Sequence, residues 1–547
     1  MDNKKKSHFI PIITAVCMVL GILIGTFYAH HFSGNRLGII NTSSNKLNAL
    51  LRIIEDQYVD TVKMADLVES AMPQILGELD PHSAYIPAKD LKAVNDDLAG
   101  SFSGIGVQFT INNDTIHVNN VIHGGPSEKV GILAGDRIIS VNDTAFVGKE
   151  ITNNSVQRKL KGPKGSSVKL GIYRLGEKEI LPFTVVRGDI PVKSIDACYL
   201  INDKYGYIKI EKFGENTYGE LLFALAQLNK KDCQGLIIDL RDNTGGFMGP
   251  AIQMINEFLP KERLIVYTEG RKSPRKNYYS NGTGSNQEMP LVVLINESSA
   301  SSSEIFSGAI QDNDRGTIVG RRSFGKGLVQ QPIEFSDGSA IRLTIARYYT
   351  PSGRCIQKPY NKGNDEEYEM DIMNRFEHGE FFSQDSIKQD ESKVYHTAIG
   401  RPVYGGGGIM PDYFIPVDTT GMTSYFQMAR NRRLIIQFSF NYTDKHRPAL
   451  QQYKDWPSLL QHLKSQNLLE QFARFAEEKG LKRRNILMYK SKELFQLNLY
   501  GNIIYNMIDM EAYIEYLNQS DTAVKKAVEI LERKEAFPKA SDGISFN

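Results

Sequence analysis

The side chains of this chain best suited to nucleophilic chemistry lie in a run of serines, residues 299–303. The run follows a short apolar segment, 291–295, that is typical of a buried strand, and it precedes Ile305, Ala309 and Ile310 at helical spacing. The serines are therefore predicted to lie where a strand turns into a helix. The first N–H groups of a helix have no partner within it and lie at the positive end of its dipole, so they can stabilise an oxyanion.

The spacing of Ser301 and Glu304 also fits a Ser-x-x-Glu capping box, in which the serine is purely structural. Lys326 favours catalysis instead. It lies between two glycines and close to strand-like segments, where its amine cannot easily reach water. An amine held out of water loses proton affinity, so Lys326 can serve as the general base for a serine.

A phosphate-binding loop is the competing interpretation of this segment, because residues 320–326 spell GxxxxGK after a strand. Such a loop needs Ser or Thr next, to hold magnesium, and a helix after that; here the next residue is Gly327. From Leu328 onward the sequence alternates and leads to a hairpin turn at Asp337 and Gly338. The pattern therefore disfavours nucleotide binding.

SASSSE followed by FGKG resembles the signature of the carboxyl-terminal processing proteases, the tail-specific peptidases of the S41 family. The resemblance implies that Ser301 is the nucleophile and Lys326 the base, at the spacing of that family. It also implies a supporting role for Gln330, four residues after the lysine. Asp312, in the helix that follows the serines, matches a commonly implicated aspartate.

A second glycine-rich turn, residues 241–246, follows the strand-like segment 235–240. Two adjacent glycines allow the backbone to approach a ligand closely, although a purely conformational role is also possible. The resemblance implies that Gly245 or Gly246 donates an N–H to the oxyanion. The second donor would be the amide of Ser302, where the family usually has alanine.

Residues 101–190 have the alternating pattern of a small β-rich domain. The segments FSGIGV (102–107) and GILAGDRIISVN (131–142) resemble a PDZ domain. In such a domain a glycine-rich loop receives a terminal carboxylate on backbone amides, while a strand edge pairs with the peptide main chain. The implied partners are proteins with free apolar C-termini, and the implied loop residues are Gly104, Ile105, Gly106 and Val107.

Residues 1–32 are predicted to be an uncleaved signal anchor, with a buried soluble helix as the alternative. Three lysines, 4–6, precede an apolar run, 9–29, that is long enough to span a bilayer as a helix. Phe27 and Tyr28 lie where a cleavable signal would have small residues. By the positive-inside rule, the rest of the chain is expected on the periplasmic, extracytoplasmic side of an inner membrane.

Composition excludes several other classes. The 65 basic and 63 acidic residues give a net charge of +2, which offers no electrostatic case for nucleic acid. Four scattered cysteines are too few for a disulfide framework or a metal cluster. We expect neither a metal nor an organic cofactor.

The expected fold is therefore α/β, with a protease core that the resemblance implies to be ClpP/crotonase-like. The turn at residues 80–83 and the polar insertion 361–392 are interpreted as structural, the insertion as a surface excursion. A catalytically inactive, membrane-tethered PDZ scaffold is the alternative to a membrane-anchored serine endopeptidase, and an oligomer is compatible with both. The predicted parts are an anchor (1–32), a helical region (42–100), the PDZ domain (101–190), the protease domain (191–419) and a helical accessory domain (420–547).

Overall fold

The computed structural model of this protein describes residues 9–33, 43–98, 100–112 and 114–540, and it divides into two units, residues 1–76 and 77–547. The first unit contains α1 (Phe9–Ser33), α2 (Ser43–Gln57) and most of α3 (Met64–Gly77). Across the described ranges, no helix combines the length and the apolar character needed to cross a membrane. The predicted anchor is thus not confirmed and stays a prediction.

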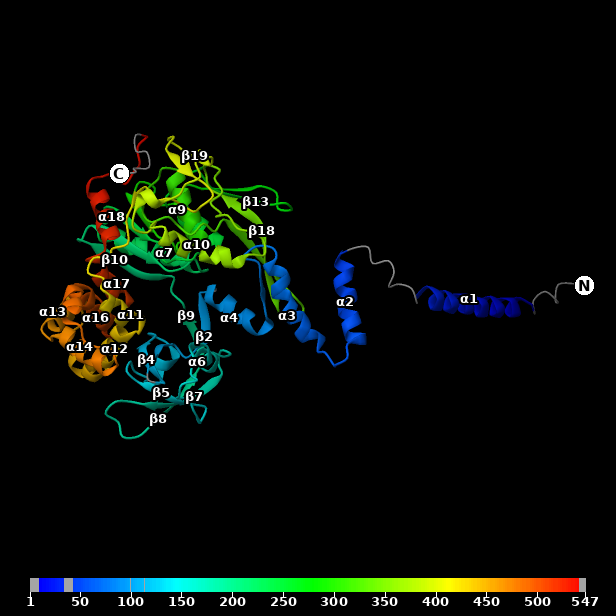
Figure 1. Ribbon diagram of the computed structural model, residues 1–547, viewed down its shortest axis with the longest axis horizontal. Coiled ribbons are helices and arrows are strands. Elements are labelled where there is room, and N and C mark those ends of the chain that lie inside the picture. The colour runs from blue at the N-terminus through cyan, green and yellow to red at the C-terminus, as the bar shows by residue number, and fades with distance from the viewer. Residues whose placement is uncertain (1–8, 34–42, 99, 113, 541–547) are drawn as a thin grey trace, which may run out of the picture. The chain divides into compact units, whose positions relative to one another are not determined.

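The protease core is built on a six-stranded sheet in the order β10–β11–β12–β15–β16–β21. Figure 1 labels β10, the first of these strands. Only β10 pairs antiparallel with its neighbour; the other pairs are parallel. Strands β12 and β15 are buried along their whole length, as expected for parallel strands covered on both faces. The strands span Ile195–Ile201, Tyr205–Ile210, Leu236–Asp239, Leu291–Ile295, Thr317–Gly320 and Tyr413–Phe414 in this order.

Helices cover both faces of this sheet. Alternate strand residues such as Ile238 and Val293 pack with α7 (Thr217–Asn229), α8 (Met248–Asn256) and α9 (Ser302–Asp312). The residues between them pack on the opposite face against α18 (Thr522–Glu532). The last helix therefore belongs to the protease core, although the sequence pattern grouped it with the helical accessory domain.

A second sheet has the order β1–β18–β13–β14, with β17 also paired to β18. Its strands are β1 (Ala84–Ile86), β13 (Leu264–Glu269), β14 (Lys276–Tyr279), β17 (Leu328–Glu334) and β18 (Ala340–Tyr349). Because Lys326 is followed by strand β17 and not by a helix, the phosphate-loop interpretation is excluded. Strand β1 brings the turn at residues 80–83 to this sheet.

The insertion at 361–392 differs from the predicted surface excursion. It forms α10 (Asp365–Glu377) and a short 3₁₀ helix (Gln384–Ser386), and Tyr368 and Arg375 of α10 are buried. A small two-stranded sheet, β19 (Val394–His396) and β20 (Pro402–Tyr404), follows it. The polar composition of the insertion did not indicate that Tyr368 and Arg375 would be buried.

The PDZ domain has a sheet in the order β3–β4–β5–β7–β8, with β6 paired to β5, and two helices. Strand β3 lies at its edge and pairs on one side only, with β4. The strands that enter and leave the domain, β2 (Ser101–Gly104) and β9 (Gly188–Pro191), pair with each other and form a two-stranded neck. The other elements are α4 (Ala88–Leu98) before the neck, β3 (Val107–Asn112), β4 (Thr115–Val121), α5 (Pro126–Lys129), β5 (Arg137–Val141), β6 (Thr144–Ala145), α6 (Asn153–Leu160), β7 (Ser167–Tyr173) and β8 (Leu181–Val186).

The helical domain has its own apolar core, formed by α11 to α17. Within it, α13 and α14 are separated at Asn467, whose φ of 48° is left-handed. The helices are α11 (Ser424–Asn431), α12 (Leu434–Leu450), α13 (Trp456–Lys464), α14 (Leu468–Glu478), α15 (Asn485–Lys490), α16 (Lys492–Met507) and α17 (Met510–Asn518).

Candidate active site

Ser301 occupies a strained turn between β15 and α9. It is the N-cap of α9, with φ 56° and ψ −114°, a conformation that a residue with a side chain rarely adopts. A Cβ added to Gly245 would lie 2.7 Å from the Cβ of Ser301 and 3.0 Å from the nitrogen of Ser302. Glycine at 245 is therefore required for the close approach of the two turns.

The hydroxyls of the serine run are not equivalent. Ser299, Ser302 and Ser303 donate to main-chain carbonyls in the segment 240–246, at 2.8, 3.0 and 2.8 Å. The Ser301 hydroxyl lies in capping-box geometry with Glu304, and among the described residues it donates to no acceptor. Ser301 is thus the one serine of the run whose hydroxyl is left available for chemistry.

Glu304 joins the serine turn to the lysine loop. Its Oε2 accepts from the N–H groups of Ser301 (2.8 Å) and Lys326 (2.9 Å), and its Oε1 accepts from Ser323 Oγ (2.5 Å) and Gly325 N–H (2.7 Å). The carboxylate is fully buried, and burial raises the pKa of Glu304 while these four hydrogen bonds lower it. The glutamate predicted as half of a capping box therefore also fixes the loop of the predicted base.

Tyr348, on β18, holds the same two segments from their carbonyl side. Its hydroxyl lies 3.1 Å from the carbonyl oxygen of Ser301 and donates to that of Lys326 as well. Burial raises the pKa of Tyr348 well above its ordinary value, so the hydroxyl keeps the proton that it donates. Ser301 and Lys326 are thus fixed relative to each other through both their N–H groups, at Glu304, and their carbonyl groups, at Tyr348.

The amine of Lys326 is mostly out of water. Burial, followed by the charge of Arg342, lowers the pKa of Lys326 to about 8, against the opposing charges of Glu304 and Asp80. The Nζ of Lys326 lies 3.4 Å from Oε1 of Gln330. With this pKa about a tenth of the amine is neutral at pH 7, and the neutral form is the one that can act as a base.

The turn at residues 80–83 orients Gln330, a role that the sequence did not reveal. Gln330 Nε2 donates to the carbonyl of His82, and Asp80 Oδ1 accepts from the N–H groups of His82 and Ser83, both at 3.0 Å. Burial, and then the charge of Lys326, lowers the pKa of His82 to about 4, so its ring is neutral; it lies 2.9 Å from the hydroxyl of Tyr368. The Asp-Pro-His-Ser turn signal was visible in the sequence, but its distance of 248 residues from Gln330 hid the contact.

Asp312 lies at the end of α9 and makes a fully buried ion pair with Arg354 at 2.7 Å. Its other oxygen accepts from the N–H and the hydroxyl of Ser352, at 3.1 and 2.7 Å. These contacts hold the segment 349–357 against α9. Any support of catalysis by Asp312 is therefore indirect, through this segment.

The turn 241–246 lies beside Ser301 because β12 and β15 are parallel neighbours, whose carboxyl ends meet at one edge of the sheet. The N–H of Gly245 donates to Asn243 Oδ1 at 2.9 Å. In the part of the chain that the structure describes, the N–H groups of Gly246 and Ser302 have no acceptor. Of the two glycines, Gly246 therefore has the N–H that is free to bind an oxyanion.

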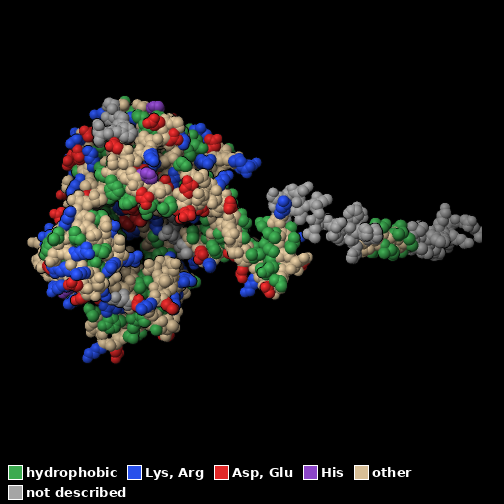
Figure 2. All heavy atoms as spheres, viewed as in Figure 1, with side chains coloured by type: hydrophobic (Ala, Val, Ile, Leu, Met, Phe, Trp, Pro, Cys, Tyr) green, Lys and Arg blue, Asp and Glu red, His purple; other side chains and the backbone are tan. Residues whose placement is uncertain are grey.

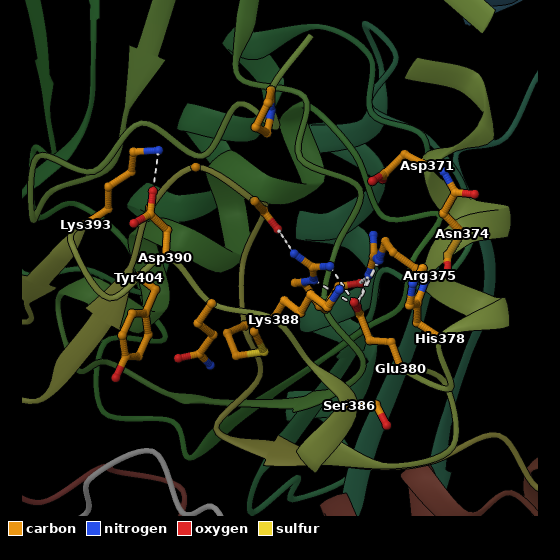
Figure 3. A pocket seen from close by; sticks show the side chains of 18 residues that line it. Asp371, Asn374, Arg375, His378, Glu380, Ser386, Lys388, Asp390, Lys393 and Tyr404 are labelled. Carbon is orange, nitrogen blue, oxygen red and sulfur yellow. Dashed lines mark hydrogen bonds and ion pairs between the residues drawn. The ribbon is translucent and has the colours of Figure 1, made fainter. Parts of the chain in front are cut away.

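Two of the pockets in the described part of the protease domain are lined by residues near the segments discussed above. One, of about 410 Å³, is bordered by α10 and the loop 404–408; Glu380 bridges Arg322 and Arg375 there, and none of the predicted catalytic residues lines it (Figure 3). The other, of about 430 Å³, is lined in part by Met248 and Val329. None of the predicted catalytic residues lines this pocket either.

The predicted carboxylate loop of the PDZ domain lies at the start of the edge strand β3. The carbonyl of Ile105 accepts from Ser127 N–H at 2.9 Å, and that of Gly106 accepts from Ile122 N–H at 3.0 Å. Gly106 has a φ of 77°, and the side chain of Ile105 is buried in the domain core. The loop is thus held by its carbonyls, next to a strand edge that has no β-sheet partner.

No cluster of three or more His, Cys, Asp or Glu able to hold a metal ion occurs in the described ranges.

Three regions of the chain match known protein families. Residues 204–367 match peptidase family S41, residues 103–185 match the PDZ domain, and residues 425–509 match a family of unknown function, DUF8443. The carboxy-terminal-processing protease of Bartonella bacilliformis is 38% identical over 309 residues, which cover 56% of this chain and 70% of that protein. The chain belongs to peptidase family S41, the family of the carboxy-terminal processing proteases. It is a serine-type peptidase that carries a PDZ domain.

Other members of the family are also similar to this S41 peptidase. The carboxy-terminal processing protease CtpB of Bacillus subtilis is 35% identical over 317 residues, 57% of this chain and 65% of that protein. Among solved structures, the photosystem II D1 C-terminal processing protease is 28% identical, covering 58% of this chain and 91% of that one, with a TM-score of 0.33.

Proposed function

We propose that this peptidase is an endopeptidase with a Ser301–Lys326 dyad, and that it processes or degrades proteins that it recognises by their C-termini. The observation that carries the dyad is the pair of bonds at Glu304, which ties the peptide N–H groups of Ser301 and Lys326 to one carboxylate oxygen. The Ser301 hydroxyl, which donates to no acceptor among the described residues, and the lowered pKa of Lys326 support the same pairing.

In the proposed reaction, Ser301 Oγ attacks the scissile carbonyl while the neutral amine of Lys326 takes the hydroxyl proton. The N–H groups of Ser302 and Gly246 hold the resulting oxyanion. Lysine, now charged, returns the proton to the leaving amine, and an acyl ester on Ser301 remains. The neutral amine then takes a proton from water, whose oxygen attacks the ester, and the charged lysine returns that proton to Ser301 Oγ as the acid is released. Gln330, held by the His82 carbonyl, orients the amine throughout.

Turnover of an unfolded protein by wild type and by Ser301→Ala tests this assignment. The Ser301→Ala variant should lose all measurable cleavage. Ser302→Ala is the matched control: it removes only the hydroxyl that donates to Gly246 and keeps the main-chain amide, so most activity should remain. Full activity in Ser301→Ala would refute the dyad, whereas no turnover by the wild type would leave an inactive PDZ scaffold as the function.

Recognition of C-termini is proposed for the loop 104–107 and the edge strand β3. Main-chain pairing at a strand edge gives affinity, and the terminal carboxylate gives specificity. A reporter that ends in Ala-Ala should be cleaved much faster than one that ends in Asp-Asp or in an amide. Ile105→Glu should remove this preference. Equal rates for amidated and free reporters would show that the PDZ domain does not recognise free C-termini.

Attachment to an inner membrane, with the catalytic domain on the periplasmic side, is proposed from the lysines and the apolar run at the start of the sequence. A reporter fused after Asn547 that works only after export should be active, and one that works only in the cytoplasm should be silent. The opposite result would place the enzyme in the cytosol. Whether it assembles as an oligomer is left open by this proposal.

A further inference from the structure

The helical domain contacts the PDZ domain through one face of α12. Its core-facing residues, such as Ile435, Phe438 and Tyr442, pack inside the helical domain. Four other residues, at positions i, i+1, i+4 and i+7, share a second face of the helix, as the helical repeat requires. They are Phe440, Asn441, Asp444 and Arg447.

Each of these four residues meets the PDZ domain. Asp444 pairs with Arg137 of β5 at 2.5 Å, and the two side chains are only 12% and 24% exposed. The ring of Phe440 lies edge-on to His117 of β4, with centroids 4.8 Å apart. Phe440 is 5% exposed although it is not part of the helical-domain core, so its contact with the PDZ domain contributes to its burial.

The remaining contacts lie at the ends of this face. Asn441 Oδ1 accepts from Asn112 Nδ2 at 3.2 Å. A Cβ added to Gly135, whose φ is 97°, would lie 3.0 Å from Nε of Arg447. The contacts involve β4, β5 and the far end of β3, whereas the loop 104–107 that starts β3 takes no part in them.

The same helical domain is also fixed to the protease sheet. Glu511 Oε2 accepts from the N–H of Cys198 in β10 at 2.8 Å, and Asn518 donates to the hydroxyl of Tyr199 at 2.7 Å. Just beyond α17, Asp521 pairs with Arg241, the first residue of the oxyanion turn, at 2.7 Å. The helical domain thus bridges the PDZ sheet and strand β10 of the protease sheet. Figure 2 shows the surface hollowed where the three parts meet.

From these contacts we infer that the helical domain is an internal brace that holds the peptide-binding edge of the PDZ domain in a fixed position relative to Ser301. Without it, the PDZ domain would depend chiefly on the two-stranded neck β2–β9, which can bend as a hinge. A tail captured on a fixed edge is presented to the catalytic serine at a raised effective concentration only if both sites can be engaged together. This role rests on the proposed reading of C-termini, and it assigns a function to the region matched by DUF8443.

Charge reversal across the Arg137–Asp444 pair tests the brace in the full chain. Arg137→Glu and Asp444→Arg place like charges in contact, and the double variant restores an opposite pair in reversed order. We expect each single variant to lose about tenfold of the rate advantage of a free over an amidated reporter, and the double variant to recover most of it. Lys149→Glu, which reverses an exposed charge with no ion pair among the described residues, is the matched control and should behave as wild type.

Two further measurements separate the brace from the proposed function. Hydrogen exchange on full-length Ser301→Ala should show faster exchange in β4, β5 and α12 for the single variants and recovery in the double, whether or not the enzyme cleaves anything. Binding of an Ala-Ala peptide should be unchanged. Unaltered exchange in both single variants, or a double variant that exchanges as fast as they do, would overturn the brace. If exchange recovers in the double variant but the wild type cleaves free and amidated reporters equally fast, the proposed recognition of C-termini would be contradicted instead.

Discussion

Two junctions of the molecule, one between the catalytic loops and one between α12 and the PDZ domain, are built differently. At the catalytic junction, the buried carboxylate of Glu304 accepts four hydrogen bonds, and Tyr348 holds the same two segments by their carbonyls. At the junction of α12 with the PDZ domain, Arg447 is half-buried, and its buried Nε and Nη2 atoms have no partner in the described structure. Burial lowers the pKa of Arg447, and the charges of Asp444 and Asp136 only partly oppose this.

This difference indicates what each junction must do. A network with every buried polar group paired has one favourable geometry, which a reaction at a defined atom requires. A junction that leaves a buried cation unpaired gives up stabilisation, because the undocked arginine regains water. The catalytic junction is therefore expected to be rigid, and the PDZ junction to be held at a smaller free-energy cost of opening.

The largest contrast is expected from exchanging lysine and arginine. Lys326→Arg keeps the charge but cannot deprotonate, so kcat/KM should fall by about 10³-fold or more. Arg137→Lys, the same exchange in reverse at the other junction, should change it less than about threefold. Steady-state rates on one peptide substrate check both, and an arginine variant with more than a tenth of wild-type activity would remove Lys326 as the base.

The next contrast is Glu304→Gln, in which one carboxylate oxygen becomes an amide NH₂ group that cannot accept a hydrogen bond. Two of the four donors lose their acceptor, so kcat should fall by about 10- to 100-fold with little change in KM, and the free energy of unfolding should fall by about 1–3 kcal/mol. Glu304→Asp, which keeps the charge but shortens the reach, should also lose kcat. Chemical denaturation and kinetics together distinguish a positioning defect from simple loss of fold. An unchanged kcat in folded Glu304→Gln would contradict the positioning role.

Arg447→Met is the matching change at the PDZ junction, and its sign should be opposite. Replacing an unpaired buried guanidinium by an apolar side chain of similar length should leave the free energy of unfolding unchanged or raise it by up to about 1 kcal/mol. Thermal unfolding of Arg447→Met beside Glu304→Gln measures the difference. If Arg447→Met destabilises by more than Glu304→Gln, the two junctions do not differ as described.

The smallest effect is expected at Arg342. Its positive charge contributes, after burial, to the lowered pKa of Lys326. Because Arg342 is exposed, solvent screens this charge, and Arg342→Gln should raise the pKa of Lys326 by only a few tenths, which lowers kcat/KM at pH 7 by about two- to threefold. A lowered pKa in this variant would show that the two charges do not interact in this way.

Local sequence patterns predicted most of the strands, turns and helices that form within single short segments. The apolar run 291–295 and the serines after it gave a strand, a turn and a helix, because burial and helix starts are local properties. The glycines around Lys326 and the strand-like segments near them predicted an amine out of water. The PDZ domain was predicted from the resemblance of segments 102–107 and 131–142 to such domains.

Contacts between distant segments could not be predicted from these patterns. Periodicity shows which face of a helix is buried, but not what covers it, so α18 was not placed on the protease sheet. Glu304 fitted a local cap, and its bonds to residues about twenty positions away arose only in the fold. The contact of Arg137 with Asp444, 307 residues apart, has no local signature at all.

The pH dependence of kcat/KM tests the central claim, that neutral Lys326 activates Ser301. A folded-state pKa of about 8 means that the active, neutral amine is lost as the pH falls through that value. Below about pH 8 the rate should therefore fall about tenfold per pH unit, and above it the rate should level off. His82→Gln should leave this limb in place, since the pKa of His82 is about 4. A profile that is flat from pH 6 to 9, or that falls as the pH rises, would contradict the account.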